Sequence, residues 1–444
     1  MLDFLDRIDL KCMCLASRDL RALSQSVLYR EIDLSDFDMN RYSVAVLCLT
    51  HTIFRRPHLA QYTRYLDIEL DPEWTEEISS MMTHTEQTHT LSDLFAEDVL
   101  GPIQNLMIER QSRSFFRSKL STIPIMLISC LPNLQYLRIT VDEHNLPLLV
   151  TLVQKGWGAR QGYPLNRLRF LAVSYSGRKW STKMSFRDIS PFLVLPQLEE
   201  LRVAGCTDSG LRSVLQSPFA DLQPRTSSIS FIGFAESYLN SESIQWMLTT
   251  CEALKGFSFN NRSCKLFQNC TGDLLSALHR QRRNIQDVRV SCTCGDFRPN
   301  GIIKNPISFH DYAQLKLLSL DQIQISPQTL LPCSLEHLII QNCRMPVFHQ
   351  VARIVSLSGT TLPSLKIISL YPDALFPGKM LDLPSVGATT LLLKQSQERL
   401  HRLVQGTNID IRFEYALLEK IASDYSFAAE TGPPGQYGPL IRLD

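Results

Sequence analysis

Apolar residues recur along most of the chain in a fixed order, apolar-x-x-apolar-x-apolar. Nine copies follow one another, and their successive starts lie 20 to 34 residues apart. The copies are Leu134-Leu137-Ile139, Leu168-Leu171-Val173, Leu198-Leu201-Val203, Thr226-Ile229-Phe231, Leu254-Phe257-Phe259, Ile285-Val288-Val290, Leu315-Leu318-Leu320, Leu335-Leu338-Ile340 and Leu365-Ile368-Leu370. Each copy ends in alternating apolar and polar positions, which predicts a short strand with one buried face. Thr63-Leu66-Ile68 indicates an early strand, and Leu391 with Leu393 indicates a weak late one.

The stretches between these strands favour helices. We expect helices at residues 146–155, 209–216, 241–250, 274–283 and 347–355. This alternation predicts the α/β class and a solenoid, with parallel strands on the concave face and helices outside. The strand half resembles a leucine-rich repeat, whose apolar side chains are structural because each unit buries them only against its neighbours.

The first residues follow a different pattern. Leucines at helical spacing over residues 1–26 predict helices, and residues 28–34 predict a strand. The runs Phe4–Lys11, Cys14–Arg21 and Val27–Arg30 resemble the later part of an F-box, in the form that heads fungal F-box/leucine-rich-repeat proteins. The Leu-Pro-x-Glu segment that opens this family's first helix is absent, so the resemblance is to a truncated or degenerate F-box.

The resemblance implies the substrate-recognition subunit of a Skp–cullin–F-box ubiquitin ligase. The F-box would dock on a Skp-type adaptor, and through it on the cullin-based ligase, by means of Leu5, Leu10, Leu15 and Leu20. An alternative for each of these leucines is a place in a small helical core. An alternative for the whole chain is a leucine-rich-repeat interaction scaffold with a non-functional F-box.

An unidentified target protein would bind on the concave face of the strands. The side chains that alternate with the apolar ones point there, and the candidates are Tyr136, Arg138, Phe170, Glu200, Arg202, Asp287, Arg289 and His337. Three arginines share one strand position, and arginine with aromatic residues is typical of binding hot spots. One hypothesis is therefore an acidic or phosphorylated target segment. The alternative is a solvated face, on which Glu200 and Asp287 neutralise Arg202 and Arg289.

These patterns divide the chain into five parts. Residues 1–34 form the F-box-like helical module, and residues 35–70 form a connector with the first repeat-like strand. Residues 71–116 form a polar insertion that we expect to be mobile. Residues 117–425 form the repeat array, and residues 426–444 form a flexible tail.

Composition and charge narrow the choice of partners. Of the 444 residues, 67 are leucine, 45 are Lys or Arg, and 44 are Asp or Glu, which gives a formal net charge of +1. We therefore expect neither nucleic acid nor membrane among the partners, since both would require a clear excess of positive charge. The basic run at residues 280–283 sits at the end of a predicted helix, and its three arginines are too few for a nucleic-acid site.

Signatures of an enzyme are absent from the sequence. It contains no G-x-S-x-G, H-E-x-x-H, Walker-type or dinucleotide-binding motif, so we expect no catalysis and no cofactor. The pairs Cys12/Cys14 and Cys292/Cys294 have no further ligands at zinc-site spacing, so we also expect no metal. The charged N-terminus is unlike a signal peptide, and we expect a cytoplasmic or nuclear protein.

Overall fold

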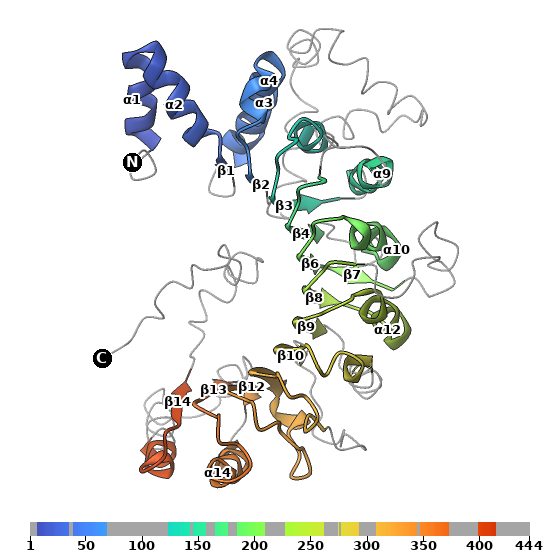
Figure 1. Ribbon diagram of the computed structural model, residues 1–444, viewed down its shortest axis with the longest axis vertical. Coiled ribbons are helices and arrows are strands. Elements are labelled where there is room, and N and C mark those ends of the chain that lie inside the picture. The colour runs from blue at the N-terminus through green and yellow to red at the C-terminus, as the bar shows by residue number, and fades with distance from the viewer. Residues whose placement is uncertain are drawn as a thin grey trace, which may run out of the picture. The chain divides into compact units, whose positions relative to one another are not determined.

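The computed structural model describes most of the predicted strands (Figure 1). The described residues are 7–34, 39–68, 123–142, 145–156, 165–175, 184–208, 227–261, 274, 277–292, 308–343, 347–372 and 398–413. The chain divides into two compact units, Met1–Ile229 and Ser230–Asp444. The predicted insertion at 71–116, the helix at 209–216, the weak late strand at Leu391 and Leu393 and the tail at 426–444 lie outside the described residues.

Two helices open the described part of the first unit. α1 (Arg7–Ala16) and α2 (Arg18–Leu28) pack against each other (Figure 1). The Oγ atom of Ser17 accepts a hydrogen bond from the amide of Leu20 at 3.1 Å and so caps α2. The Nε of Arg21 donates to the carbonyl of Cys14 at 3.0 Å, which ties α2 back to the end of α1. The helices predicted over residues 1–26 are confirmed within the described residues.

The first unit continues in a parallel sheet. Its strand order is β1 (Glu31–Asp33), β2 (Tyr65–Ile68), β3 (Tyr136–Val141), β4 (Phe170–Tyr175) and β6 (Glu200–Ala204). After α1 and α2, the described helices of this unit include α3 (Met39–Arg55), α4 (Pro57–Ala60), α9 (Leu146–Gly156), α10 (Phe186–Ile189) and the 3₁₀ helix η2 (Ser190–Val194), and residues 123–129 are also helical. The short strands β5 (Met184–Ser185) and β7 (Cys206–Thr207) pair with each other. α9 and α10 lie on one face of the sheet (Figure 1).

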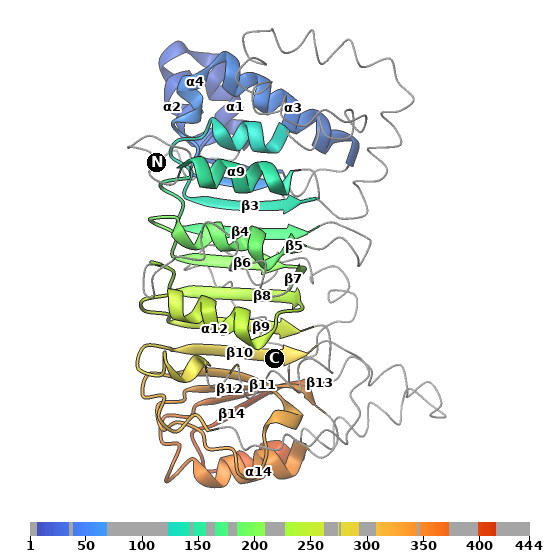
Figure 2. The same ribbon diagram turned by 90° about the vertical axis from the view of Figure 1, so that its right-hand side faces the viewer.

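The second unit repeats this arrangement. Its parallel strands follow chain order: β8 (Phe231–Ser237), β9 (Gly256–Asn261), β10 (Asp287–Cys292), β11 (Leu317–Asp321), β12 (His337–Cys343), β13 (Ile367–Pro372) and β14 (Asp410–Phe413). Its described helices include α12 (Ser241–Thr250), the 3₁₀ helix η3 (Gln322–Gln324) and α14 (Val347–Leu357), and residues 277–279 and 398–404 are also helical. Figure 2 shows α12 lying lengthwise in front of β8 and β9. The α/β class and the parallel strands are confirmed, and the helices predicted at 146–155, 241–250 and 347–355 are present.

The apolar positions of the predicted copies form the core. Leu134, Leu137 and Ile139 have no exposed surface, and the corresponding described residues of the other copies are similarly buried, except Phe231, which is discussed below. Thr226 lies outside the described residues. Equivalent leucines are aligned across neighbouring strands, as with Leu137 of β3 and Leu171 of β4. Each strand therefore buries its apolar side chains against the next strand and the helices beside it.

Most strands begin with the same pattern of backbone hydrogen bonds, in which one carbonyl accepts from two successive amides of the next strand. The carbonyl of Arg64 accepts hydrogen bonds from the amides of Gln135 and Tyr136 at 2.8 and 2.9 Å. The carbonyl of Gln135 accepts in the same way from the next pair of amides, those of Arg169 and Phe170. The second unit has the same feature, for example at the carbonyl of Lys255. We call this arrangement the strand-start junction, and it fixes register through the backbone rather than through side chains.

One predicted copy has the wrong register. The sequence analysis placed its strand apolar residues at Ile229 and Phe231, but β8 pairs Ile232 with Phe257 and Phe234 with the next apolar residue of β9. Phe231 instead lies opposite Gly256, half-buried rather than in the core. Apolar residues at 231, 232 and 234 fit either frame, and only the neighbouring strand selects one of them.

Two further predictions need correction. The helix predicted at 274–283 ends at residue 279 in the described part, and residues 280–284 form a turn. β14 was not predicted at Asp410–Phe413, where apolar alternation is present but the leading leucine of the other copies is missing. The structure also adds the long helix α3 within the predicted connector.

Candidate functional site

The four leucines predicted to contact an adaptor have different environments. Leu10 of α1 is 3% exposed and belongs to the core, whereas Leu15 is 83% exposed. Leu20 of α2 is half-buried, and Leu5 lies outside the described residues. Leu23, which the sequence analysis did not select, is 56% exposed one helical turn after Leu20. The α1–α2 pair therefore presents two large apolar side chains, Leu15 and Leu23, to solvent.

The predicted target-binding residues lie on the sheet face that alternates with the buried one. In each unit we call this the helix-free face, because it is opposite the face on which described helices lie, α9 and α10 in the first unit and α12 in the second (Figure 1). The residues fall into two groups, one in each unit. Tyr136, Arg138, Phe170, Glu200 and Arg202 lie on the neighbouring strands β3, β4 and β6. Asp287, Arg289 and His337 lie on β10 and β12 of the second unit.

An aromatic stack crosses the helix-free face of the first unit. The ring centroids of Tyr65 and Tyr136 are 4.3 Å apart, and those of Tyr136 and Phe170 are 4.0 Å apart. The guanidinium of Arg202 lies 5.7 Å from the ring centroid of Phe170, within range of a cation–π contact. Tyr136 and Phe170 are only 8% and 6% exposed, so they form a largely buried aromatic surface and do not protrude as anchors for a partner.

Arg138 forms a buried ion pair with Asp67. The Nη1 atom of Arg138 lies 3.0 Å from Oδ2 of Asp67, and the two side chains are 7% and 1% exposed. The hydroxyl of Tyr65 also lies 3.4 Å from this carboxylate. Burial and the nearby charge of Asp67 raise the pKa of Tyr65 above its ordinary value, so it keeps its proton and donates. Arg138 is thus a counter-ion within the sheet.

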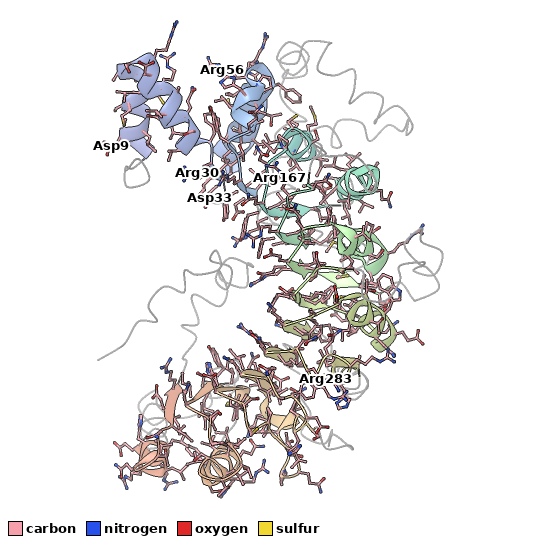
Figure 3. All side chains as sticks on the ribbon, viewed as in Figure 1. Asp9, Arg30, Asp33, Arg56, Arg167 and Arg283 are labelled. Carbon is pink, nitrogen blue, oxygen red and sulfur yellow. The ribbon has the colours of Figure 1, made fainter. Side chains whose placement is uncertain are left out.

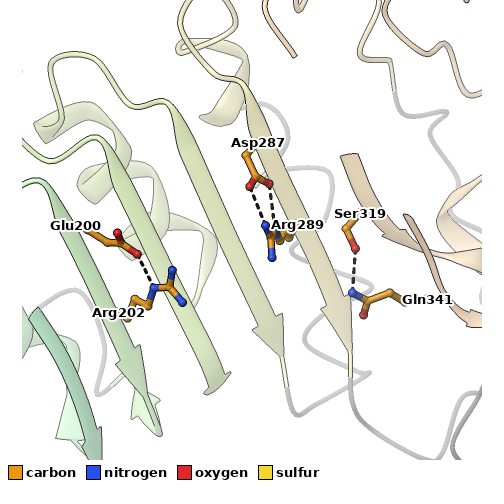
Figure 4. Close-up of polar contacts among 6 residues, drawn as sticks. All are labelled: Glu200, Arg202, Asp287, Arg289, Ser319 and Gln341. Atoms are coloured by element: carbon orange, nitrogen blue, oxygen red, sulfur yellow. Dashed lines mark hydrogen bonds and ion pairs between the residues drawn. The ribbon is translucent and has the colours of Figure 1, made fainter. Parts of the chain in front are cut away.

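Arg202 and Arg289 each pair with a carboxylate on their own strand (Figure 4). Nε of Arg202 lies 2.5 Å from Glu200, and Arg289 makes two hydrogen bonds to Asp287, of 3.1 and 3.0 Å. These side chains are about one-fifth to one-quarter exposed. The neutralising pairs of the alternative interpretation are therefore present, and an incoming anion would have to share or displace a carboxylate.

His337 lies in a more polar part of the second unit. Its Nε2 is 2.9 Å from the Oγ of Ser369. Burial, helped by the charges of Arg412 and Arg289, lowers the pKa of His337 to about 4, so the ring is neutral at pH 7. Arg412 itself forms a 2.8 Å ion pair with Asp410 two residues earlier on its strand. The neutral imidazole can both donate and accept a hydrogen bond.

Buried polar groups support this face of the second unit. The Nε2 of Gln341 donates to the Oγ of Ser319 at 2.9 Å (Figure 4), and the Nδ2 of Asn342 donates to Asp321 at 2.6 Å. Ser319 and Asp321 have no exposed surface. Their hydrogen bonds hold the polar side chains in place.

Sequence reasoning missed Tyr65 and Asp67, the partners that explain the burial of Tyr136 and Arg138. Both occupy the intervening positions of the early strand, so the alternation applied to later strands could have identified them. It also missed Arg412 near His337, because β14 was not recognised, whereas Ser369 lies at an intervening position of the predicted copy Leu365-Ile368-Leu370.

Comparisons with known proteins leave the family open. No family model matches the chain, and a search among curated proteins finds no match. Among the residues described, no helix has the length and apolar character needed to cross a bilayer. Within that same part of the chain, no group of three or more His, Cys, Asp or Glu side chains could hold a metal ion.

Proposed function

We propose that the chain is a fungal-type F-box/leucine-rich-repeat protein and serves as the substrate-recognition subunit of a Skp–cullin–F-box ubiquitin ligase. In this proposal the α1–α2 pair docks on a Skp-type adaptor, and the helix-free face of the repeat array binds the target protein. The ligase then acts by proximity, since the chain itself supplies no chemistry.

The exposure of Leu15 and Leu23 carries the proposal. Leu15 is 83% exposed, and burying this side chain in an interface would lower the free energy. Single exposed leucines are common on protein surfaces. Here, however, both lie on a helical pair whose sequence resembles a module that docks through apolar helix faces, and Leu10 already satisfies the local core.

The test is co-purification of the whole chain with a Skp-type adaptor. We expect the double variant Leu15→Glu/Leu23→Glu to lose at least about tenfold in adaptor affinity, because each buried leucine contributes roughly 1.5–3 kcal/mol. The matched control is Leu330→Glu, which changes a leucine of similar exposure (55%) in the second unit. Equal binding by wild type and the double variant would overturn the docking surface.

The interaction scaffold with a non-functional F-box is the competing outcome. Absence of adaptor binding by the wild-type chain, with normal folding, would favour it. Target binding would not distinguish the ligase subunit from the scaffold, since both would bind a target on the helix-free face.

A further inference from the structure

The turn after residues 277–279 carries three arginines that the proposed function does not use. Arg280 and Arg283 are exposed, and Arg282 is half-buried (Figure 3 labels Arg283). Arg282 donates to the carbonyl of His279 at 3.1 Å. Within the described ranges, no carboxylate forms an ion pair with any of the three. The turn thus exposes arginines that form no ion pair with the described carboxylates.

A buried side chain holds this turn in place. Gln281, 8% exposed, points inward between the arginines. Its Nε2 donates to the carbonyls of Leu248 and Cys251 at 2.9 and 3.1 Å, at the C-terminal end of α12. Those carbonyls lack helical partners, so the glutamine satisfies them. The backbone of Gln281 also accepts from Asn284 and Ile285. The arginines on either side are therefore displayed from an anchored turn.

Two lysines extend the positive charge to the neighbouring strands. The carbonyl of Lys255 accepts from the amide of Gln286, and the carbonyl of Gln286 accepts from the amide of Lys316. Lys255 and Lys316 thus occupy equivalent strand-start positions on either side of the turn's own strand, about 5 Å from it on each side. Both lysines are exposed. Lys316 lies 3.4 Å from Glu336, which is shared with another lysine.

The acidic residues described near the turn do not balance this charge. Glu252 lies just before Lys255, and the carboxylate of Asp311 lies 3.4 Å from His310. Asp287, which opens the next strand, pairs with Arg289, and Glu336 is shared by two lysines. Cations beside the C-terminus of α12 are favoured by the helix dipole, but that dipole is equivalent to only about half a negative charge, against three arginines.

We propose that the turn at residues 280–283, with Lys255 and Lys316, is a docking surface for an acidic protein segment. Guanidinium groups bind carboxylates in a two-pronged geometry, and an anchored turn reduces the entropy lost on binding. An acidic protein segment fits better than nucleic acid, because Tyr312, the aromatic residue next to Asp311, is 1% exposed and offers no base-stacking surface. This surface is independent of the adaptor and target sites proposed above.

The experiment measures binding of a fluorescein-labelled oligoglutamate peptide to the full chain by anisotropy at low salt. We expect Arg280→Gln/Arg282→Gln/Arg283→Gln to weaken binding about tenfold, since each exposed pair contributes modestly. The matched control is Arg55→Gln/Arg56→Gln/Arg64→Gln, which removes the same charge from exposed arginines of the first unit and should change affinity less than about twofold.

Equal weakening by both triple variants would indicate a net-charge effect and overturn the proposal, as would no weakening by the first. Tighter binding of an oligouridine RNA of equal length, lost in the first variant, would overturn it in favour of nucleic acid. Gln281→Ala keeps all charges and should weaken peptide binding about threefold by releasing the turn. Unchanged affinity in a folded Gln281→Ala protein would overturn the role of the anchor.

Discussion

Arg138 and Asp67 lie on neighbouring strands of the first unit and are almost fully buried, so each charge depends on the other. Two charges removed from water are tolerated when they pair closely, yet either one alone is costly. This explains why an arginine at the strand position predicted for recognition is not available to a ligand. Arg202 and Arg289, at equivalent positions, keep part of their surface exposed.

Breaking this pair should destabilise the first unit strongly. We expect Arg138→Ala to lower the free energy of unfolding by about 3–5 kcal/mol, because Asp67 would remain as an uncompensated buried charge. The double variant Arg138→Met/Asp67→Leu should recover most of the loss. Urea denaturation of the three proteins measures this, and a single variant as stable as wild type would contradict the assignment.

His337 should make stability depend on pH. Its folded pKa of about 4 lies below the ordinary value of 6.5, so the folded state binds this proton less readily than the unfolded state. The stabilisation is complete above pH 6.5 and is lost progressively as the pH falls toward 4. The unfolding free energy measured at pH 7.5, 6 and 4.5 should therefore decline more in wild type than in His337→Gln. Parallel declines in the two proteins would refute this origin.

At the scale of elements, alternation predicted most strands correctly because the buried face must be apolar at every second residue. It could not choose between frames where apolar residues are adjacent, as at Phe231 and Ile232. It could not find β14, which has alternation without the leading leucine. It also could not pair Asp67 with Arg138. These residues are far apart in the sequence, and alternation within a strand does not say which strand lies next to it.

Gly256 of β9 leaves room for the ring of Phe231 on the neighbouring strand β8. A Cβ atom at Gly256 would lie 2.3 Å from Cδ2 of the Phe231 ring. We expect Gly256→Ala to destabilise the protein by about 1–3 kcal/mol, as for other overpacked sites. Thermal unfolding measures the loss, and adding Phe231→Ala should remove the clash.

Gly359→Ala is the matched control, because a Cβ there meets nothing within 4 Å. It should be neutral or slightly stabilising, since alanine restricts the unfolded chain. A loss for Gly359→Ala as large as that for Gly256→Ala would show that the effect does not come from contact with Phe231.

At the scale of the whole molecule, the chain divides into two compact units whose strands are stabilised by adjacent strands. In such an array each strand contacts only its neighbours, so a local change should have a local effect. The net charge of +1 is compatible with locally charged surfaces, because these depend on where charged residues are placed and not on the net charge of the chain.

We therefore expect Gly256→Ala to raise amide hydrogen exchange mainly in the second unit. β9 and β10 should lose protection, while β2 to β4 should exchange as in wild type. Mass spectrometry of peptic fragments can compare the two sets of strands. A uniform rise across all strands would contradict the division into units and indicate a single cooperative unfolding transition.

The strand-start junction has a consequence for how a chain of this kind can change in evolution. The carbonyl of Arg64 accepts hydrogen bonds from two backbone amides, so these bonds themselves exclude only proline, which lacks the N–H, and any further restriction comes from the packing of the side chain. The stretch from Arg64 to Gln135 is about twice as long as that from Gln135 to Arg169, yet both end in the same pair of bonds. Insertions between junctions are thus compatible with the array. A whole repeat can also be duplicated or deleted from one junction to the next, because the same pair of backbone hydrogen bonds can form between the strands that become neighbours.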